Sequence, residues 1–362
     1  MKIVLVGRYG EGNILTGPER VARELYSELT KSSVKAVFID YYFSGYEGSS
    51  LFKKGFGKEN INNGLVLRLG IFPFLFMLFQ KKFEIIHIVN SQRFILLLLL
   101  FNPFFSGKII TTLHGFIRNE IPAKNFWKKR YILDLWVERF LVKTSKLLIF
   151  PSTLLLNTFK QFYKIPDKKN FVIHNGISTV FLEQKKVFPS IENGTKIVFY
   201  NGFNSAINRG LDKVLDLMNN LKYEVVLYVI GVKVEVKPQK NIKIFFVDSM
   251  PHVELIKFVS DKHFILKSSA VDSFSILIAE CMALGLIPII SENIGIKDVI
   301  KHGKNGFIYN SSSSLELTKL MDEIYRGDYD LNLISSNAKE TSRTLSWENT
   351  TKEYISAYKS IL

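Results

Sequence analysis

Short apolar runs alternate with stretches of helical periodicity along the first half of the chain. Val21, Leu25 and Leu29 recur at the spacing of one helix face after a glycine-containing turn, which predicts a helix over residues 18–29. A second helix with a basic start is predicted over 128–143, and continuous apolar runs predict strands over 3–6, 36–39, 65–67, 85–89, 108–113, 147–150 and 171–173. Unbroken apolar strands separated by helices predict a parallel sheet that is covered on both faces.

The pattern stops over residues 179–195, and this stretch is predicted to be a linker. It contains Pro189, Ser190, Asn193 and Gly194 and has no clear period. Beyond it, strands are predicted over 196–200, 224–229, 242–246, 264–266, 287–290 and 306–308, with helices over 212–219, 252–259, 275–284 and 314–325. A last helix over 347–361 follows Ser346, which is a good N-cap residue.

These elements predict an α/β protein with two doubly wound domains, at 1–178 and 196–344, and a terminal segment at 345–362. The length of 362 residues agrees with two domains rather than one. Ligands of such sheets bind at the carboxyl ends of the strands, and two such ends are expected to face each other across a cleft.

The composition excludes several classes of protein. With 47% hydrophobic and 22% charged residues, the chain is neither disordered nor collagen-like. Its single cysteine, Cys281, can form neither an internal disulfide nor a cysteine-based zinc site, which favours a reducing, cytoplasmic location. The apolar run at 3–6 is too short for a signal peptide and is expected to be a buried strand.

The positive charge is concentrated in the first half of the chain. Residues 1–180 hold 26 basic and 12 acidic side chains, whereas the remainder holds 22 basic and 21 acidic ones. The imbalance indicates an anionic partner, for which nucleic acid and a membrane surface are the usual candidates. A lysine-rich composition is the plain alternative, but it would affect both halves alike. Nucleic acid is disfavoured because the basic residues are not interleaved with a recognition motif.

Two apolar runs, at 71–79 and 94–101, bear on the membrane alternative. Each is shorter than the ~18–20 residues that span a bilayer, so neither is predicted to be a transmembrane helix. They are expected to be buried elements of the first domain or an apolar surface that beds into one leaflet. The residues predicted to face an anionic membrane or the acceptor are Lys124, Trp127, Lys128, Lys129 and Arg130, with Phe72, Phe74 and Phe76 as wedges.

The most specific stretch for chemistry runs from Asp272 to Pro288. Asp272 lies in a predicted strand–helix loop, Glu280 follows eight positions later inside the helix, and Gly285 ends that helix. The helix is predicted to begin near Ser275, where its first free amides and its positive dipole end form a site for phosphate. The alternative is ordinary helix surface chemistry, with a solvated Glu280.

The surrounding residues resemble the signature of the retaining GT-B glycosyltransferases, particularly family 4. In that family an acid-x7-acid motif precedes Ala-Met-Ala-x-Gly-x-Pro and two hydrophobic residues. The resemblance extends over nearly the whole chain and rests on Asp272, Glu280, Met282, Ala283, Gly285, Pro288, the segments 16–20, 172–177 and 300–307, and the end of the chain from Ser346. It implies a GT-B fold whose last helix crosses back to the first domain.

The resemblance also implies roles for individual residues. Glu280 would accept hydrogen bonds from the ribose of the nucleotide, and Asp272, in place of the usual glutamate, would contact hydroxyls of the donor sugar. His114 would face the sugar, and Gly17 would let the backbone approach the diphosphate or the sugar. The amides around Phe274, Ser275, Ile276 and Leu277 would bind the diphosphate.

One departure from the family concerns the cations near the diphosphate. The usual first cation is replaced by Phe203, and only Arg209 remains. Because a leaving nucleoside diphosphate gains charge in the transition state, the loss of a cation is expected to lower the rate. Lys267, at the end of a predicted strand, is a candidate to supply the charge; the alternative is a solvated lysine.

Other motifs favour plainer interpretations. His87 is expected to be a core or rim residue, the Asp328-Tyr-Asp330 sequence is a chance match to a metal motif, and residues 7–12 do not fit the dinucleotide spacing. No metal and no other cofactor is expected, because helix amides and Arg209 would neutralise the diphosphate.

The resemblance implies a retaining, metal-independent glycosyltransferase that moves a sugar from a nucleotide-diphosphate-sugar to a glycan or lipid-linked acceptor. Synthesis of surface polysaccharide or glycolipid is the expected context, with the enzyme cytoplasmic or peripheral on the inner face of the plasma membrane. Two alternatives stay open: a catalytically weak binding or scaffold protein, and a nucleotide-sugar epimerase.

Overall fold

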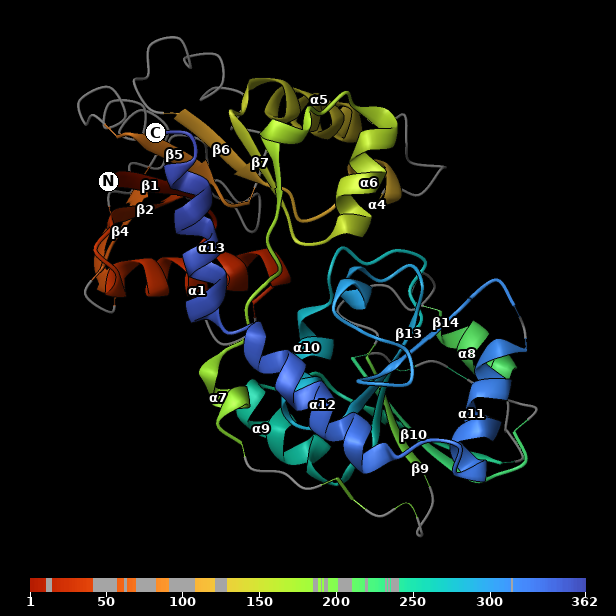
Figure 1. Cartoon of the computed structure of the whole chain (residues 1–362). Coiled ribbons are helices and arrows are strands. Elements are labelled where there is room, and N and C mark those ends of the chain that lie inside the picture. Colours follow the sequence, from red (N-terminus) through yellow and green to blue (C-terminus); the bar gives the residue numbers. More distant parts are fainter. Residues whose placement is uncertain are drawn as a thin grey trace. The chain divides into compact units, whose positions relative to one another are not determined.

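The chain forms two compact units in the computed structural model (Figure 1). The structure describes residues 1–10, 15–41, 57–61, 64–69, 83–90, 108–120, 129–184, 188–189, 191, 195–200, 210–218, 221–231, 233, 235, 241–313 and 315–362. Unit 1 comprises Met1–Gly176 and Trp347–Leu362, and unit 2 comprises Ile177–Ser346. The segment Trp347–Leu362 therefore belongs to the first unit.

Unit 1 is built on a sheet of eight strands, which are parallel except at one edge. The antiparallel edge strand β3 was not expected from the sequence, because Gly57–Ile61 is polar and short of apolar residues. The strand order is β3 (Gly57–Ile61), β4 (Gly64–Leu69), β2 (Lys35–Tyr41), β1 (Lys2–Gly7), β5 (Ile85–Ile88), β6 (Lys108–Thr112), β7 (Leu147–Phe150) and β8 (Asn170–Val172).

Alternation along β5 shows how this sheet is covered on both faces. Ile86 and Ile88 belong to a buried cluster with Val137 and Leu141 of α5 (Lys129–Thr144). His87 points to the other face, where it meets α13 (Trp347–Lys359). Helix α13 packs beside α1 (Gly17–Lys31), and unit 1 also contains α4 (Ile117–Glu120), α6 (Thr153–Phe162) and the short helix η3 (Asp167–Lys169).

His87 anchors the terminal helix through a buried polar network. Its Nδ1 atom lies 2.7 Å from the Tyr358 hydroxyl, and its Nε2 atom lies 2.8 Å from the Thr112 Oγ1 atom. Tyr354 and Tyr358 are almost fully buried. Because buried polar groups are stable only when hydrogen-bonded, this network fixes α13 against β5 and β6. The expectation that His87 is a core residue is thereby confirmed.

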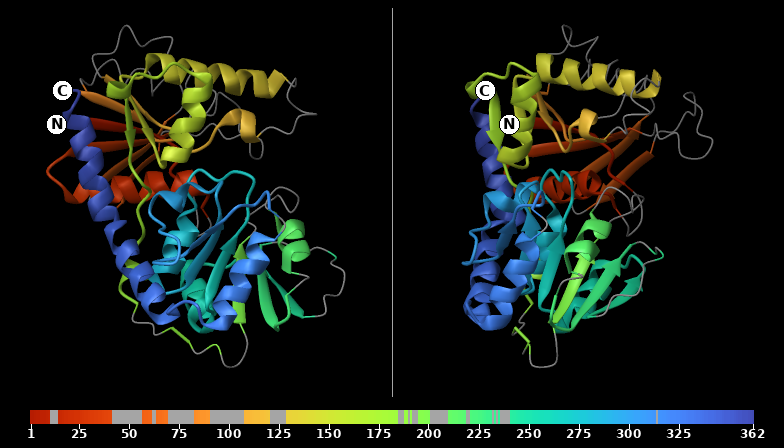
Figure 2. Two further views of the ribbon diagram at one scale, coloured as in Figure 1. Left: turned by 45° about the vertical axis from the view of Figure 1, so that its right-hand side comes forward. Right: turned by 90° about the vertical axis from the view of Figure 1, so that its right-hand side faces the viewer.

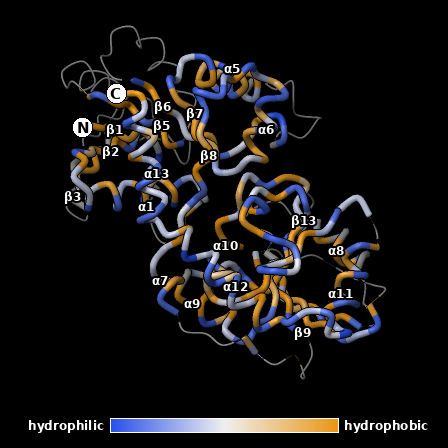
Figure 3. Tube along the Cα trace, in the orientation of Figure 1, coloured by the Kyte–Doolittle hydropathy of each residue, from blue (hydrophilic) through white to orange (hydrophobic). Residues whose placement is uncertain are grey.

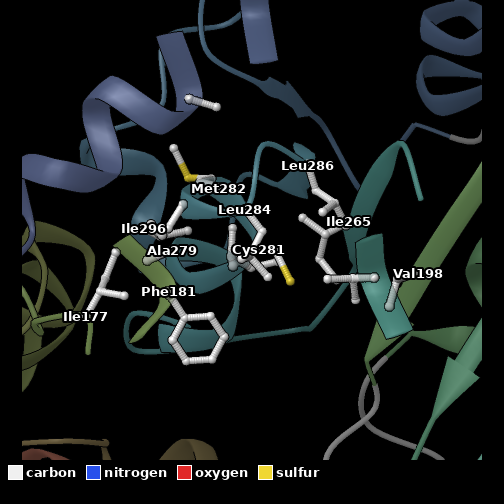
Figure 4. Close-up of a cluster of buried hydrophobic side chains, with 14 of the residues drawn as sticks. Ile177, Phe181, Val198, Ile265, Ala279, Cys281, Met282, Leu284, Leu286 and Ile296 are labelled. Carbon is white, nitrogen blue, oxygen red and sulfur yellow. The ribbon is translucent and has the colours of Figure 1, made fainter. Parts of the chain in front are cut away.

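Unit 2 is built on six parallel strands in the order β11 (Ile242–Val247), β10 (Val225–Ile230), β9 (Thr195–Tyr200), β12 (Phe264–Lys267), β13 (Ile287–Ser291) and β14 (Phe307–Tyr309). Successive residues alternate between two buried clusters. Ile197, Phe264 and Leu266 lie in one cluster, whereas Val198 and Ile265 lie in the other. Figure 4 shows the second cluster, and Figure 3 shows hydrophobic residues gathered on the strands of both units.

Helices cover both faces of the unit 2 sheet (Figure 2). The first four residues of the predicted linker form α7 (Thr179–Leu182), whose Phe181 is fully buried in the core of unit 2. Helix α12 was not predicted and packs against α10. The helices of this unit are α7, α8 (Leu211–Met218), α9 (His252–Phe258), η4 (Val259–Asp261), α10 (Ile276–Ala283), η5 (Gly295–Asp298), α11 (Glu316–Arg326) and α12 (Leu331–Thr344).

Candidate functional site

The strand order of unit 2 places a binding position at the carboxyl ends of β9 and β12. These two strands are neighbours although β10 and β11 lie between them in sequence, so the chain direction across the sheet reverses there. Ligands of doubly wound sheets bind outside the carboxyl ends of the strands at this reversal. Lys267 ends β12 at this point, and the loop 268–275 leads from it to α10.

The loop between β12 and α10 is held by backbone hydrogen bonds to the loop after β13. The Asp272 amide donates to the Asn293 carbonyl at 3.1 Å, and the Gly295 amide donates to the Asp272 carbonyl at 2.9 Å. The Ile296 amide donates in the same way to Phe274 at 3.0 Å. Asp272 therefore has a fixed backbone position, as a residue that orients a ligand requires.

Both carboxylate oxygens of Asp272 have protein partners. Oδ1 accepts a hydrogen bond from the Phe274 amide at 3.1 Å, and Oδ2 lies 2.7 Å from the Lys267 ammonium. The Lys267 side chain is 4% exposed and that of Asp272 is 16% exposed. The lysine is thus buried in an ion pair and is not solvated.

Helix α10 begins with an unusual residue. Ser275, the N-cap, has φ +73° and ψ +75°, and it is the one non-glycine residue with positive φ in the described part of the chain. Its Oγ atom is buried and makes no hydrogen bond with the described residues. The Ile276 and Leu277 amides, in the first turn, have no acceptor within the helix. These amides and the Ser275 hydroxyl could donate hydrogen bonds to an anion bound at the start of the helix.

The structure bears on two of the predicted ligand contacts, those of the Phe274 amide and of Glu280. The Phe274 amide is engaged by Asp272, so the amides that remain for a diphosphate are those of Ser275, Ile276 and Leu277. Glu280 lies two turns into α10 and is fully buried, not solvated. Its ribose contact stays a prediction, and a buried carboxylate at this position needs hydrogen-bond donors around it.

In unit 1, His114 follows β6 at the carboxyl end of the sheet. Its Nε2 atom lies 2.8 Å from the Val89 carbonyl oxygen. Burial lowers the pKa of His114 to about 4, although the hydrogen bond to Val89 acts in the opposite direction. The ring is therefore neutral at pH 7. Because a carbonyl only accepts, Nε2 carries the proton, and Nδ1 is left as an acceptor for a hydroxyl group.

The start of α1 lies at the carboxyl end of β1. Thr16 donates from its amide and its hydroxyl to the Glu19 carboxylate, each at 2.8 Å, and Arg8 forms an ion pair with Glu19 at 2.8 Å. A Cβ at Gly17 would meet no atom of another described residue within 4 Å, so no described side chain fills the space beside it. Arg8, which directly follows β1, brings a cation to this edge of the sheet. The sequence analysis did not single it out as a candidate.

The outer face of α5 exposes large apolar residues. Ile132, Leu133 and Trp136 are 37%, 47% and 56% exposed. Arg139 and Lys143 continue the same stripe and are exposed as well. The stripe therefore runs from exposed apolar residues at 132–136 to exposed basic residues at 139 and 143.

Several predicted residues lie outside the described residues: Arg209, Phe203, the phenylalanines 72, 74 and 76, Lys124, Trp127 and Lys128. Lys129 and Arg130 form the first two positions of α5.

The Asp-Tyr-Asp sequence has a structural role. Asp328 pairs with Arg326 at 2.7 Å, and Asp330 caps α12. In the described parts of the chain there is no group of three residues suited to a metal ion, and no helix long and apolar enough to cross a membrane.

Comparisons with known proteins match both units. A family model described as Glycosyltransferase Family 4 matches residues 15–181, and one described as Glycosyl transferases group 1 matches residues 181–341. No curated protein matched the sequence significantly.

Solved structures of similar fold cover almost the whole chain. Sucrose-phosphate synthase from Thermosynechococcus elongatus is 14% identical, with a TM-score of 0.73 over 99% of this chain and 98% of that one. Anabaena HepE in complex with UDP-glucose is 14% identical, with a TM-score of 0.71 over 99% and 100%. The lipopolysaccharide outer core galactosyltransferase WaaB is 15% identical, with a TM-score of 0.73 over 100% of both chains.

Proposed function

The chain belongs to the GT-B glycosyltransferases, with a family 4 domain followed by a group 1 domain, and we propose that it transfers a sugar with retention of configuration. The donor is a nucleotide-diphosphate-sugar, and the acceptor is a glycan or a lipid-linked glycan. The observation that carries the donor proposal is the start of α10 at the strand reversal of unit 2, with unused donors on Ser275, Ile276 and Leu277.

The chemistry follows from charge development on the donor. The bond between the sugar C1 and the β-phosphate oxygen breaks, and a bond between C1 and the acceptor oxygen forms on the same face. The acceptor hydroxyl passes its proton to the leaving phosphate. The amides at the start of α10, together with Arg209, stabilise the charge that builds on the diphosphate, and no metal ion is required in this proposal.

In this proposal the Asp272 carboxylate and the neutral His114 ring orient the donor sugar. Asp272 is held at both oxygens by Lys267 and the Phe274 amide, and a carboxylate can accept more than one hydrogen bond at each oxygen, so in this proposal it also accepts from sugar hydroxyls. His114 is neutral, and its Nδ1 accepts a hydrogen bond from a hydroxyl of the transferred sugar. Glu280 accepts hydrogen bonds from the ribose hydroxyls of the nucleotide.

HepE, a structural neighbour, was solved with UDP-glucose, which favours a uridine nucleotide in the first experiments.

The acceptor proposal rests on charge and on α5. An anionic membrane surface fits a unit whose first 180 residues carry 26 basic against 12 acidic side chains. The exposed Leu133 and Trp136 on α5 would enter the headgroup region, while Arg139 and Lys143 meet anionic lipid. We place the enzyme on the cytoplasmic leaflet, where it would receive a lipid-linked acceptor in the synthesis of surface polysaccharide or glycolipid.

Glu280 tests the donor site. Glu280→Ala, and the near-isosteric Glu280→Gln, should weaken the binding of UDP-glucose or of whichever UDP- or GDP-sugar binds the parent protein. The expected loss is about 1.5–3 kcal/mol for a hydrogen bond to a charged group, which is about 10- to 150-fold in Kd.

Calorimetric titration of folded protein measures the effect, and Glu254→Ala, at an exposed position on α9, is the matched control. Parental affinity in both Glu280 variants would place the donor elsewhere.

A further inference from the structure

Lys267 is a buried cation that no role in the proposed reaction has yet used. Its side chain is 4% exposed, so the ammonium is almost fully removed from water. A lysine is rarely buried to this degree unless it is paired. Its partner is Asp272, the carboxylate that the proposed function assigns to the donor sugar.

We propose that Lys267 is a positioning residue, which fixes the Asp272 carboxylate in the orientation that holds the donor sugar. This inference rests on the proposed function of Asp272. Two directed contacts, from the Lys267 ammonium at 2.7 Å and from the Phe274 amide at 3.1 Å, lock the plane of the carboxylate. A freely rotating aspartate would lack that orientation.

The backbone geometry explains why a lysine at this position can reach Asp272. Lys267 is the last residue of β12, in register with Ile290 of β13. The loop after β12 returns to the strand end, because Asp272 bridges to Ile294 just after β13. The ammonium and the carboxylate therefore meet above the end of the strand, on the side where α10 begins.

The ion pair with Lys267 also bears on why this position holds an aspartate in place of the usual glutamate. An aspartate is one methylene shorter than a glutamate, and its carboxylate stays close to its own backbone. In this chain the shorter side chain is the one whose second oxygen lies in contact with Lys267. The lysine and the aspartate thus act as one unit, and a change in either should alter the same step.

The experiment compares four variants with the parent enzyme: K267M, K267R, D272N and the double variant K267M/D272N. The assay follows UDP release from UDP-glucose, or nucleotide release from the donor in a UDP- and GDP-sugar panel that the parent uses. We expect K267M and D272N each to lower kcat by at least about tenfold, with the Kd for the nucleotide alone changed less than about twofold. K267R, which keeps the charge, should recover most of the loss.

The double variant distinguishes a positioning role from the alternatives. Removal of one partner leaves a buried charge uncompensated, so K267M alone could fail to fold, whereas the double variant removes both charges. Its kcat should lie within about threefold of that of D272N, because residues that act as a unit are not additive. A further tenfold drop, or a folded K267M with the parental kcat, would overturn the proposal.

Failure of the proposed function would look different. If the parent releases nucleotide from no donor, the transferase proposal fails, and the same variants are compared by Kd for UDP-glucose and for UDP. A positioning role then predicts that K267M weakens UDP-glucose binding by at least about tenfold and leaves UDP binding unchanged. Equal effects on the two ligands would overturn it.

Discussion

At the scale of single residues, two buried histidines, His87 and His114, are expected to make the stability of unit 1 depend on pH. Burial lowers the pKa of His87 to about 3 and that of His114 to about 4. Both values lie below the ordinary value of 6.5. As the pH falls from 6.5 toward 4, the unfolded chain therefore binds protons that the folded chain does not, and the free energy of unfolding falls.

His87→Gln tests this linkage. The variant removes one titrating group, so between pH 6 and pH 5 its free energy of unfolding should fall less steeply than that of the parent, by about 1.4 kcal/mol per pH unit. Urea unfolding at pH 7, 6 and 5 measures the slope, which is independent of the packing that the substitution also loses. Parallel slopes in the two proteins would show that His87 binds protons equally in the folded and unfolded states, which would contradict the lowered pKa.

The positions of Asp272 and Glu280 could be predicted from the sequence, whereas the partner of Asp272 could not. The spacing of Asp272 and Glu280 predicts a carboxylate in a loop and a second one in a helix, and both are found there. The contact between Lys267 and Asp272 could not be predicted, because it depends on how a loop folds back over its strand. The sequence allows Lys267 either to supply charge to the diphosphate or to be solvated; the buried ion pair contradicts the second alternative, and the first stays a prediction.

At the scale of elements, the apolar strands were predictable and some helices were not. The predicted helix over 275–284 corresponds closely to α10, and a predicted strand coincides with β7. Helix α12 was missed because its buried side carries Ser335, Ala338 and Ser342 alongside Ile334, so no apolar period is visible. The small side chains allow close packing, and Ser335 donates to the Gly285 carbonyl at 2.6 Å.

The residue directly before α8, Gly210, needs to be a glycine. Gly210 has φ +76°, and a Cβ there would lie 1.9 Å from the Ser268 carbonyl oxygen at the end of β12. Gly210→Ala should lower the free energy of unfolding by at least about 2 kcal/mol, because backbone strain and a backbone clash add together.

Chemical denaturation measures the change, and Gly327→Ala provides a matched control. Gly327 also has positive φ, at +80°, but a Cβ there would meet nothing within 4 Å. If Gly210→Ala costs no more than Gly327→Ala, the close approach to Ser268 does not constrain this position.

At the scale of the whole molecule, the uneven charge and the exposed stripe of α5 predict attachment to anionic vesicles. Each basic residue near such a surface contributes about 1 kcal/mol, and the attraction fades beyond a Debye length. Flotation should recover the protein with anionic vesicles and not with neutral ones, and less of it at physiological than at low salt. Substitution of Lys124, Lys128, Lys129 and Arg130 by glutamine should reduce recovery.

The double variant Leu133→Ser and Trp136→Ser tests the apolar part of the stripe. It should lose attachment, whereas Val253→Ser, a change at a 74% exposed position on α9 in unit 2, should keep it. Equal recovery with anionic and neutral vesicles, or no recovery with either, would contradict the membrane proposal. The transferase proposal would not be affected.

The most direct test of the central claim is nucleotide release from a panel of UDP- and GDP-sugars, with the anomeric configuration of the product determined by NMR. The account predicts release of UDP or GDP from one α-linked donor and an α-linked product. A β-linked product would contradict retention, and a donor converted to another nucleotide-sugar would indicate an epimerase. Tight binding with no release from any donor would indicate a binding protein and contradict the central claim.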